Sequence, residues 1–269
     1  MLRFIRTRLQ QGVRTADYPR GPVSFPERFR GRPVFDAARC ENCRDCLARM
    51  PSELLVIGGE GRPRLDVGAS LFAPEEAEAC PHGAIRFTAE HRMASTTREG
   101  LESAAEPAAL VRALDRKARG LFGRSLRLRS VSAGSCNGCE AELAALGNVV
   151  FDMARFGVQF VASPRHADGI VITGAVSANM REAVYRTWEA TPDPKLVIAV
   201  GACAINGGPF RGSPAVANGV PADIPVDLWV PGCPPHPLTV LDGLLRLLGR
   251  IENGRREHAA SAPTAGTSR

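Results

Sequence analysis

The chain has 269 residues, of which 44% are hydrophobic and 23% are charged. This composition excludes gross disorder, a collagen-like repeat and a polytopic membrane protein, and the length predicts about two domains. The net charge of +6 is concentrated in residues 1–32, which hold eight arginines and two acidic residues. No stretch approaches the roughly 20 apolar residues that span a bilayer, and arginines interrupt the first apolar residues, so we expect neither a spanning helix nor a signal peptide.

Residues 1–32 predict a basic N-terminal arm. One or two amphipathic turns around Leu2, Ile5 and Leu9 are followed by a stretch rich in proline and glycine. A basic arm is suited to anionic lipid, nucleic acid or an acidic partner protein, and charge does not choose among them. A solvated arm that becomes ordered on assembly is the structural alternative.

Residues 33–91 alternate short apolar runs with turns rich in Cys, Gly and Pro. These runs predict a small domain with too little apolar surface for a large core, so something other than hydrophobic burial must stabilise it. Residues 92–124 have apolar positions at helical spacing and predict a helical connector that ends near residues 120–123.

The chain changes character over residues 125–252, where apolar strand-like runs alternate with helical stretches. Such alternation indicates a parallel α/β sheet covered on both faces. Residues 253–269 predict a disordered tail. The expected strands are 125–134, 156–163, 169–176, 195–202 and 226–232, and the expected helices are 139–155, 178–190 and 237–251.

The chain contains eight cysteines in two groups of four. In a reducing cytoplasm disulfides are disfavoured, so this number points to metal binding or catalysis. The first group contains Cys40, Cys43 and Cys46, spaced as in the bacterial ferredoxin run C-x2-C-x2-C-x3-C-P, whose fourth cysteine binds the other cluster. The fourth position is occupied here by Met50, which the expected Pro51 follows.

A second ferredoxin run ending at Cys80 would place cysteines at positions that hold Ser70, Ala73 and Glu76. All four ligands of one cluster are therefore present, and all four of the other are lost. Residues 33–91 thus resemble a two-cluster ferredoxin domain that retains one [4Fe-4S] cluster. Structural zinc is the alternative, although zinc modules usually pair their cysteines across a loop. The retained ligands are Cys40, Cys43, Cys46 and Cys80, and the lost positions are Met50, Ser70, Ala73 and Glu76.

The second group consists of Cys136, Cys139, Cys203 and Cys233, each just after an expected strand. Ligands of parallel sheets gather at the carboxyl ends of the strands, so these thiols are expected to meet at one edge. The surrounding sequences resemble the family of complex I 20 kDa subunits and [NiFe]-hydrogenase small subunits over about residues 125–250. The resemblance implies a flavodoxin-like domain that binds one [4Fe-4S] cluster. Its matching segments are GSCNGCEAEL (134–143), FGVQFVASPRHADGIVITGAV (156–176), VIAVGACAINGG (197–208) and VPGCPP (230–235).

Complex I subunits typically carry two adjacent cysteines at the first ligand position, whereas Asn137 and Gly138 separate Cys136 from Cys139 here. This spacing resembles the membrane-bound, formate hydrogenlyase-type hydrogenases. The segment over residues 15–33 is also similar to the approach to the clusters in ferredoxin-like subunits of complex I and formate hydrogenlyase. We therefore expect a flavodoxin-like parallel α/β domain preceded by a small ferredoxin-like α+β domain, with two [4Fe-4S] clusters in all.

Three further residues are candidates because of the same resemblance. Glu142 matches an acidic position of the family and would relay protons, although a capping or solvated carboxylate is the structural alternative. Arg165 and His166 resemble family residues that line the cluster or its cavity. His82 and His236 follow Cys-Pro turns, and we interpret them as surface residues or neighbours of a ligand.

No phosphate-binding loop, dinucleotide fingerprint or Ser-His-Asp signature is present, and no cysteines remain for a [NiFe] centre. The leading hypothesis is an electron-transfer subunit of a membrane-associated hydrogenase complex, peripheral on the cytoplasmic side of the cytoplasmic membrane. Expected partners are a large subunit of the [NiFe]-hydrogenase or complex I 49 kDa type, other ferredoxin-like subunits and membrane subunits. The alternatives are a complex I-like subunit that reduces quinone and a zinc-stabilised nucleic-acid-binding module, but nucleic acid is not an expected partner because base-reading motifs are absent.

Overall fold

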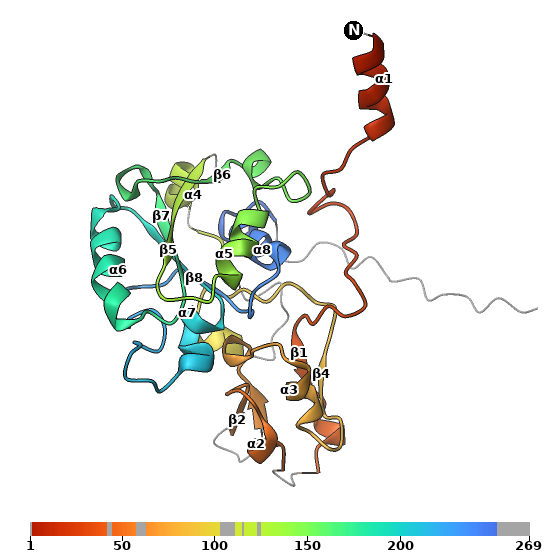
Figure 1. Ribbon diagram of the computed structural model, residues 1–269, viewed down its shortest axis with the longest axis vertical. Helices are drawn as coiled ribbons and strands as arrows, with labels where there is room; N and C mark the ends of the chain where they lie inside the picture. Colours follow the sequence, from red (N-terminus) through yellow and green to blue (C-terminus); the bar gives the residue numbers. More distant parts are fainter. Residues whose placement is uncertain are drawn as a thin grey trace, which may run out of the picture.

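The computed structural model describes residues 2–41, 45–57, 63–102, 111–114, 116–122 and 125–251. Figure 1 shows a larger unit built on a sheet, a smaller unit beneath it and an N-terminal helix that stands away from both. The smaller unit is formed by the first half of the chain, and the sheet by the second half.

The larger unit contains five parallel strands in the order β6-β5-β7-β8-β9. Counted along the chain within this sheet, the order is 2-1-3-4-5, which is the flavodoxin-like arrangement. The predicted flavodoxin-like α/β class is thereby confirmed. The strands are β5 (Leu126–Ser132), β6 (Val158–Phe160), β7 (Gly169–Thr173), β8 (Leu196–Val200) and β9 (Leu228–Val230).

Helices cover both faces of the sheet, as Figure 1 shows. Helices α5 (Gly138–Ala145) and α8 (Pro237–Leu247) share one buried cluster with Leu126 and Leu128 of β5. Helix α6 (Ala178–Ala190) contributes Val184 to a second cluster on the opposite face. Alternate residues of each strand face opposite sides, so both faces need apolar side chains, and this explains the nearly continuous apolar runs in the sequence.

The predicted helix over 178–190 is confirmed, whereas two others end earlier than predicted. Helix α5 stops at Ala145, before a turn through Asn148 and a left-handed Asp152 (φ 44°). Helix α8 stops at Leu247, just before Gly249 adopts a positive φ. Among the described residues, no helix combines the length and the apolar character that crossing a membrane requires.

The smaller unit repeats a strand-helix-strand order twice. Strands β1 (Pro33–Phe35) and β4 (Ile85–Phe87) pair antiparallel, as do β2 (Leu55–Ile57) and β3 (Pro63–Leu65). Its main apolar cluster is small, with Leu54, Leu65 and Ile85 as buried members. The ferredoxin-like identity of this unit stays a prediction. Its helices are α2 (Asp45–Arg49) and α3 (Pro74–Glu78).

The two units are joined by contacts as well as by the chain. The 3-10 helix η2 (Val67–Ala69) packs on α7 (Ala202–Asn206), where a Cβ added to Gly68 would lie 2.9 Å from the Cγ2 atom of Ile205. Arg211 forms an ion pair with Glu53 at 2.6 Å. Both units therefore share a packed boundary that contains η2 and α7.

The predicted connector, residues 92–124, is only partly helical. Ser95 exchanges two backbone hydrogen bonds with Trp229, at 2.9 and 2.8 Å, and so extends the sheet beside β9. Helix α4 (Arg116–Phe122) ends near the predicted position. Residues 103–110, 115 and 123–124 and the predicted tail, 253–269, lie outside the described residues.

The N-terminal arm begins with helix α1 (Leu2–Gln11), which is longer than the one or two turns predicted. Beyond it, the arm lies against the larger unit. The Tyr18 hydroxyl donates to Asp242 Oδ1 of α8 at 2.6 Å, and Arg246 Nε donates to Asp242 Oδ2 at 2.8 Å. Tyr18, Asp242 and Arg246 are all buried, so the arm contributes to the core instead of being wholly solvated.

Replacing Tyr18 with Phe is expected to lower the free energy of unfolding by about 1–3 kcal/mol, because a buried carboxylate oxygen loses its donor. Tyr185→Phe provides a matched control, since the Tyr185 hydroxyl donates to Asp223 at an exposed position. That change is expected to stay within about 0.5 kcal/mol. Urea unfolding of the full chain measures both values, and equal effects of the two substitutions would contradict a structural role for the buried hydrogen bond.

Candidate functional site

The structure places the four C-terminal cysteines at the carboxyl edge of the parallel sheet. Cys136 lies in the loop after β5, and Cys139 lies in the first turn of α5. Cys203 belongs to α7, which follows β8, and Cys233 follows β9. The edge on which the sequence predicts these thiols is therefore the edge on which the fold puts them.

The loops that carry these cysteines touch one another. A Cβ added to Gly201 would lie 2.5 Å from Cys139 Sγ, and one added to Gly138 would lie 3.5 Å from Cys136 Sγ and 3.6 Å from Pro234 Cγ. The Ala202 N–H donates to the Gly232 carbonyl at 2.9 Å, which joins the loops after β8 and β9. The ends of β5, β8 and β9 thus form one continuous surface lined by thiols.

The four thiols interact electrostatically. Burial, followed by the nearby Cys203, raises the pKa of Cys139 to about 12, and burial together with Cys233 raises the pKa of Cys203 to about 11. Burial and Cys136 also raise the pKa of Cys233. Four thiolates are therefore unfavourable at this edge without a cationic group, and binding such a group would release protons.

The donor set fits an iron-sulfur cluster. Four thiols without a competing histidine among them suit soft metals, and a four-iron cluster uses one thiolate per iron. Cys139 and Cys203 are each only 8% exposed, Cys233 is partly buried, and none of these three forms a disulfide. Within the described residues, no three His, Cys, Asp or Glu side chains converge closely enough to hold a single metal ion.

Glu140 is a site residue that the sequence reasoning missed. Ser135 Oγ donates to its Oε1 atom at 2.6 Å, and Thr173 donates to the same atom. Burial alone would raise the pKa of Glu140, but these hydrogen bonds hold it below its ordinary value. Its buried Oε2 atom has no hydrogen-bond partner among the residues that the structure describes. The sequence feature that indicates Glu140 as a site residue is its position directly after Cys139, a predicted ligand.

Glu142 lies on α5, three residues after Cys139, and is partly buried. Burial raises the pKa of its carboxyl group, which favours the protonated form more than in water. A proton-relay role for Glu142 stays a prediction.

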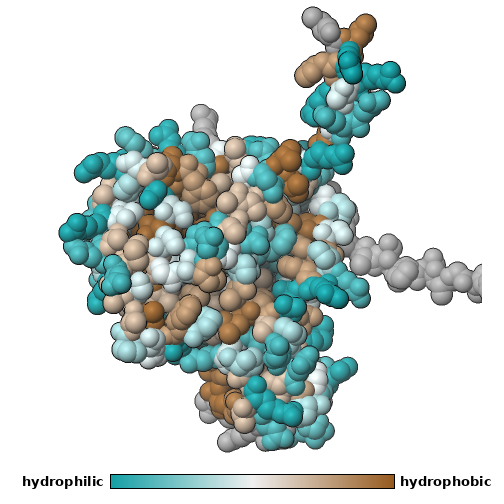
Figure 2. Space-filling model, viewed as in Figure 1, coloured by the Kyte–Doolittle hydropathy of each residue, from teal (hydrophilic) through white to brown (hydrophobic). Residues whose placement is uncertain are grey.

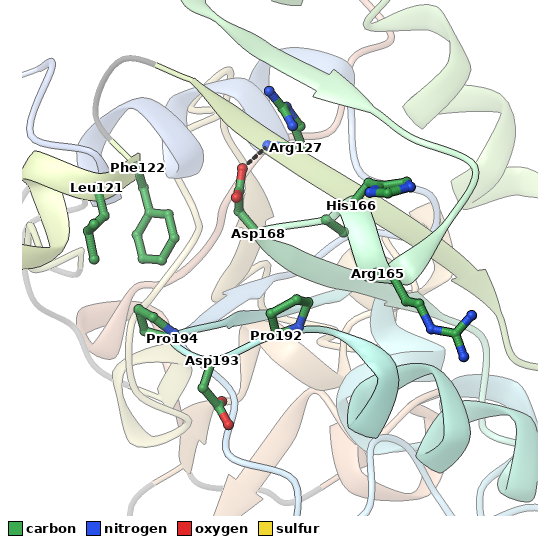
Figure 3. Close-up of a pocket in the computed structure, with 10 residues that line it drawn as sticks. Leu121, Phe122, Arg127, Arg165, His166, Asp168, Pro192, Asp193 and Pro194 are labelled. Carbon is green, nitrogen blue, oxygen red and sulfur yellow. Dashed lines mark hydrogen bonds between the residues drawn. The ribbon is translucent and has the colours of Figure 1, made fainter.

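Arg165 and His166 do not lie beside the cysteines. They belong to the 3-10 helix η6 (Pro164–His166), which precedes β7, and they line a pocket of 330 Å³ with Asp168 and Asp193 (Figure 3). This pocket is at the amino end of the sheet. Because five residues of strand separate the two ends by about 17 Å, the structure corrects the expected place of Arg165 and His166 beside the cluster.

Three of the four N-terminal cysteines lie in the described part of the smaller unit. Cys40 ends the 3-10 helix η1 (Ala37–Arg39), and Cys46 lies on α2. Cys80 follows α3, and its Sγ atom accepts a hydrogen bond from the Ala84 N–H at 3.3 Å. Cys43 lies outside the described residues, so the full quartet is not placed.

Another contact joins the segments that carry Cys40 and Cys80. His82 Nδ1 lies 3.2 Å from Glu41 Oε1, and both side chains are accessible to solvent. A Cβ added to Gly83 would lie 3.8 Å from a guanidinium nitrogen of Arg39. The loop before Cys43 and the turn after Cys80 are therefore neighbours, and His82 lies at the surface, in agreement with its interpretation.

Two of the predicted lost ligand positions, Ser70 and Glu76, belong to a hydrogen-bonded network around Glu76. This carboxylate is fully buried and accepts from the Ser70 hydroxyl and the Leu71 N–H, each at 2.7 Å, and from the Ser52 hydroxyl. Met50 packs against the small apolar cluster. Ser70 and Glu76, two of the predicted lost ligand positions, are thus hydrogen-bonded to each other.

His236 follows the Cys233 turn and caps α8. Its Nδ1 accepts a hydrogen bond from the Leu238 N–H at 3.1 Å, and its ring makes edge contacts with Phe25 and Phe151. Burial lowers the pKa of His236 to about 4. The ring is therefore neutral at physiological pH and acts as a cap and an aromatic contact.

Comparisons with known proteins identify relatives of the second half. Residues 136–247 match the family described as NADH ubiquinone oxidoreductase, 20 Kd subunit. Formate hydrogenlyase subunit 7 of Escherichia coli is 45% identical over 129 residues, 48% of this chain and 51% of that protein. The probable membrane-bound hydrogenase subunit mbhJ of Pyrococcus furiosus is 46% identical over 130 residues, 48% of this chain and 78% of that protein.

An NADH-quinone oxidoreductase subunit of Heliobacterium modesticaldum is 51% identical over 116 residues, which are 43% of this chain and 66% of that protein. Hydrogenase subunits and NADH-quinone oxidoreductase subunits are thus similar to this chain to nearly the same degree. The match spans about half of the formate hydrogenlyase protein. All four C-terminal cysteines lie within the matched family region.

Because Gly201 lies so close to Cys139, a side chain at position 201 is expected to lower the free energy of unfolding. Gly201→Ala combines a positive φ of 92° with a Cβ that would overlap Cys139 Sγ, whereas Gly212→Ala has a positive φ of 78° and open space. Both changes carry a backbone cost, which at Gly201 is about 1–3 kcal/mol because its φ of 92° and ψ of 155° belong to a region essentially confined to glycine, and the overlap should add about 1–3 kcal/mol to the first. Urea unfolding of both variants measures the difference, and a difference near zero would contradict the close approach.

Glu76 provides a second prediction. Glu76→Gln replaces one carboxylate oxygen by a donor where the buried neighbours are themselves donors, so the free energy of unfolding should fall by about 1–3 kcal/mol. The control is Glu75→Gln on the same helix, where the side chain is exposed and the change should stay within about 0.5 kcal/mol. Equal stability of the two variants in thermal and urea unfolding would show that the network does not stabilise the fold.

Proposed function

Because this chain belongs to the family of the NADH ubiquinone oxidoreductase 20 kDa subunit, we propose that it is an electron-transfer subunit of a membrane-associated oxidoreductase complex of the hydrogenase type. The observation that carries this proposal is the set of four cysteines at the carboxyl edge of the sheet, all inside the family region. Thiol ligands of this kind hold iron-sulfur clusters, which accept and release single electrons when bound.

In this proposal Cys136, Cys139, Cys203 and Cys233 hold one [4Fe-4S] cluster. The loops after β5, β8 and β9 orient the four thiols, and the burial of Cys139 and Cys203 excludes water from one side of the site. Burial of a cluster and hydrogen bonds to its sulfurs are what a protein uses to set the reduction potential. The carboxylate of Glu140 adds negative charge beside Cys139.

A second [4Fe-4S] cluster is held by Cys40, Cys43, Cys46 and Cys80. The Ala84 N–H that points at Cys80 Sγ supports this assignment, because backbone N–H groups donate to cluster sulfurs. The ferredoxin spacing of the first three cysteines supports it independently. The domain limits proposed for this organisation are an arm over 1–32, a cluster domain over 33–91, a connector over 92–124 and a cluster domain over 125–252.

A hydrogenase complex is favoured by the two residues that separate Cys136 from Cys139 and by the relatives named as a formate hydrogenlyase subunit and a membrane-bound hydrogenase subunit. The partners would be a large [NiFe] subunit, a ferredoxin-like electron donor or acceptor and membrane subunits. The complex would lie on the cytoplasmic side of the cytoplasmic membrane.

A complex I-like subunit that passes electrons to quinone is the second candidate. The 51% identity to the NADH-quinone oxidoreductase relative favours it. The large partner would then be of the 49 kDa type. Purification of the native complex separates the two candidates: nickel and hydrogen evolution support the first, and quinone reduction without nickel supports the second.

The cluster assignment predicts the metal content of the anaerobically purified full chain. We expect about eight irons and eight acid-labile sulfides per chain. Cys203→Ser and Cys80→Ser should each leave about four irons, because they remove ligands of different clusters. The control, Ala73→Ser at a lost ligand position, should leave the iron content unchanged.

Iron and sulfide analysis, with electron paramagnetic resonance of the reduced protein, measures these contents. Zinc in place of iron would contradict the proposal and favour the zinc-stabilised module. Loss of all iron in the Cys203→Ser variant, with the protein still folded, would contradict two independent clusters.

A further inference from the structure

Helix α1 makes no buried contact with the rest of the described protein. All its residues are exposed, including large apolar side chains: Leu2 is 85% exposed, Phe4 75% and Leu9 77%. Figure 1 shows the helix standing clear of both units, and Figure 2 shows hydrophobic and hydrophilic side chains together on it. An amphipathic helix gains most of its stability from a surface that covers its apolar side.

The sequence of α1 builds two different sides. At about 100° per residue, Leu2, Ile5 and Leu9 fall within a narrow stripe along the helix, and Phe4 falls outside it. Arg6 flanks this stripe on one side and Arg8 on the other. Apolar residues bordered by cations are the pattern of helices that lie in the plane of a membrane surface.

The charged side chains of α1 and of residues 12–16, which follow it, are all positive. Residues 1–16 contain Arg3, Arg6, Arg8 and Arg14 and no acidic residue. Cations of this density are complementary to a surface of anionic lipid headgroups, where each contributes to binding. Nucleic acid would satisfy the arginines but gives the apolar stripe nothing to bury against, so a lipid surface fits both sides of the helix.

The helix is tethered at a defined point of the larger unit. The Ala16 N–H donates to the Val150 carbonyl at 2.9 Å, and a guanidinium nitrogen of Arg155 donates to the Ala16 carbonyl at 2.7 Å. Beside this anchor, Val149 is 64% exposed and Val150 41%. A second small apolar surface therefore lies at the base of the arm.

We propose that α1 anchors this chain directly to an anionic membrane, with Leu2, Ile5 and Leu9 in the acyl boundary and the arginines at the lipid phosphates. The proposed function requires only that other subunits attach the complex to the membrane, so this contact goes beyond it. The anchor does not depend on the identity of the cofactors or of the catalytic subunit.

Flotation of the full chain with lipid vesicles tests the anchor. The chain should bind vesicles of phosphatidylcholine mixed with phosphatidylglycerol and bind pure phosphatidylcholine vesicles much less. Leu2→Gln, Ile5→Gln and Leu9→Gln combined should weaken binding by a factor of about ten or more. Arg6→Gln and Arg8→Gln should each weaken it about fivefold at low salt, and added salt should weaken binding by the unmodified chain.

The matched control is Gln10→Ser with Gln11→Ser, which changes the same helix outside the apolar stripe and should leave binding nearly unchanged. Thermal unfolding should be the same for all variants, because α1 contributes nothing to the core. Failure of the unmodified chain to float, equal binding to neutral vesicles, or undiminished binding after the three apolar substitutions would each overturn the proposal. If the chain ignores vesicles but the same three substitutions release it from the purified native complex, the helix binds a protein partner instead.

Discussion

The cost of ionising thiols that are gathered at one edge of a sheet, which comes first from their burial and then from their mutual repulsion, is the constraint on which the rest of this structure depends. Cys139 and Cys203 are nearly buried, and their raised pKa values show what it costs to ionise them there. The loops after three strands must nevertheless converge, and glycine at position 201 permits the chain to pass Cys139 Sγ. A parallel sheet provides this convergence because its strands all end at the same edge. The fold therefore supplies the geometry, and the bound group must supply the positive charge.

The segment that holds the predicted lost ligand positions Ser70, Ala73 and Glu76 begins next to η2, where the smaller unit packs on α7. Helix η2, which immediately precedes Ser70, packs on the helix that carries Cys203, and the charge of Glu76 is among the causes that raise the pKa of Cys233. Cys46 lies on α2, at the end of the smaller unit away from the sheet (Figure 1). Electrons that pass between the two proposed clusters would therefore cross a layer of protein that includes a buried carboxylate. The Ser52 and Ser70 hydroxyls donate hydrogen bonds to that carboxylate and hold it in place.

Much of this site could be predicted from the spacing of the cysteines and the pattern of apolar residues, because both patterns are formed by residues close together in the sequence. Apolar runs identified the five strands, and the residues just after them include the four thiols. Arg165 and His166 follow one expected strand and precede the next, so this rule does not decide their edge; only the structure shows that they lie at the start of β7. The bond between Tyr18 and Asp242 joins residues 224 positions apart, and no local pattern encodes such a partner. The donors to Glu76 likewise become visible only when separate segments are packed together.

Helix α8 connects the edge that carries the cysteines with the place where the N-terminal arm is held. Its first residues follow the Cys233 turn, and His236 caps it with a neutral ring. Less than two turns later, Asp242 accepts a hydrogen bond from the Tyr18 hydroxyl and so holds the arm that leads to α1. Because α8 is buried along its whole length, it cannot tilt without disrupting the core beneath the sheet. The point from which the arm departs is thus rigidly related to the cysteine edge, and a membrane contact made by α1 would orient that edge as well as attach it.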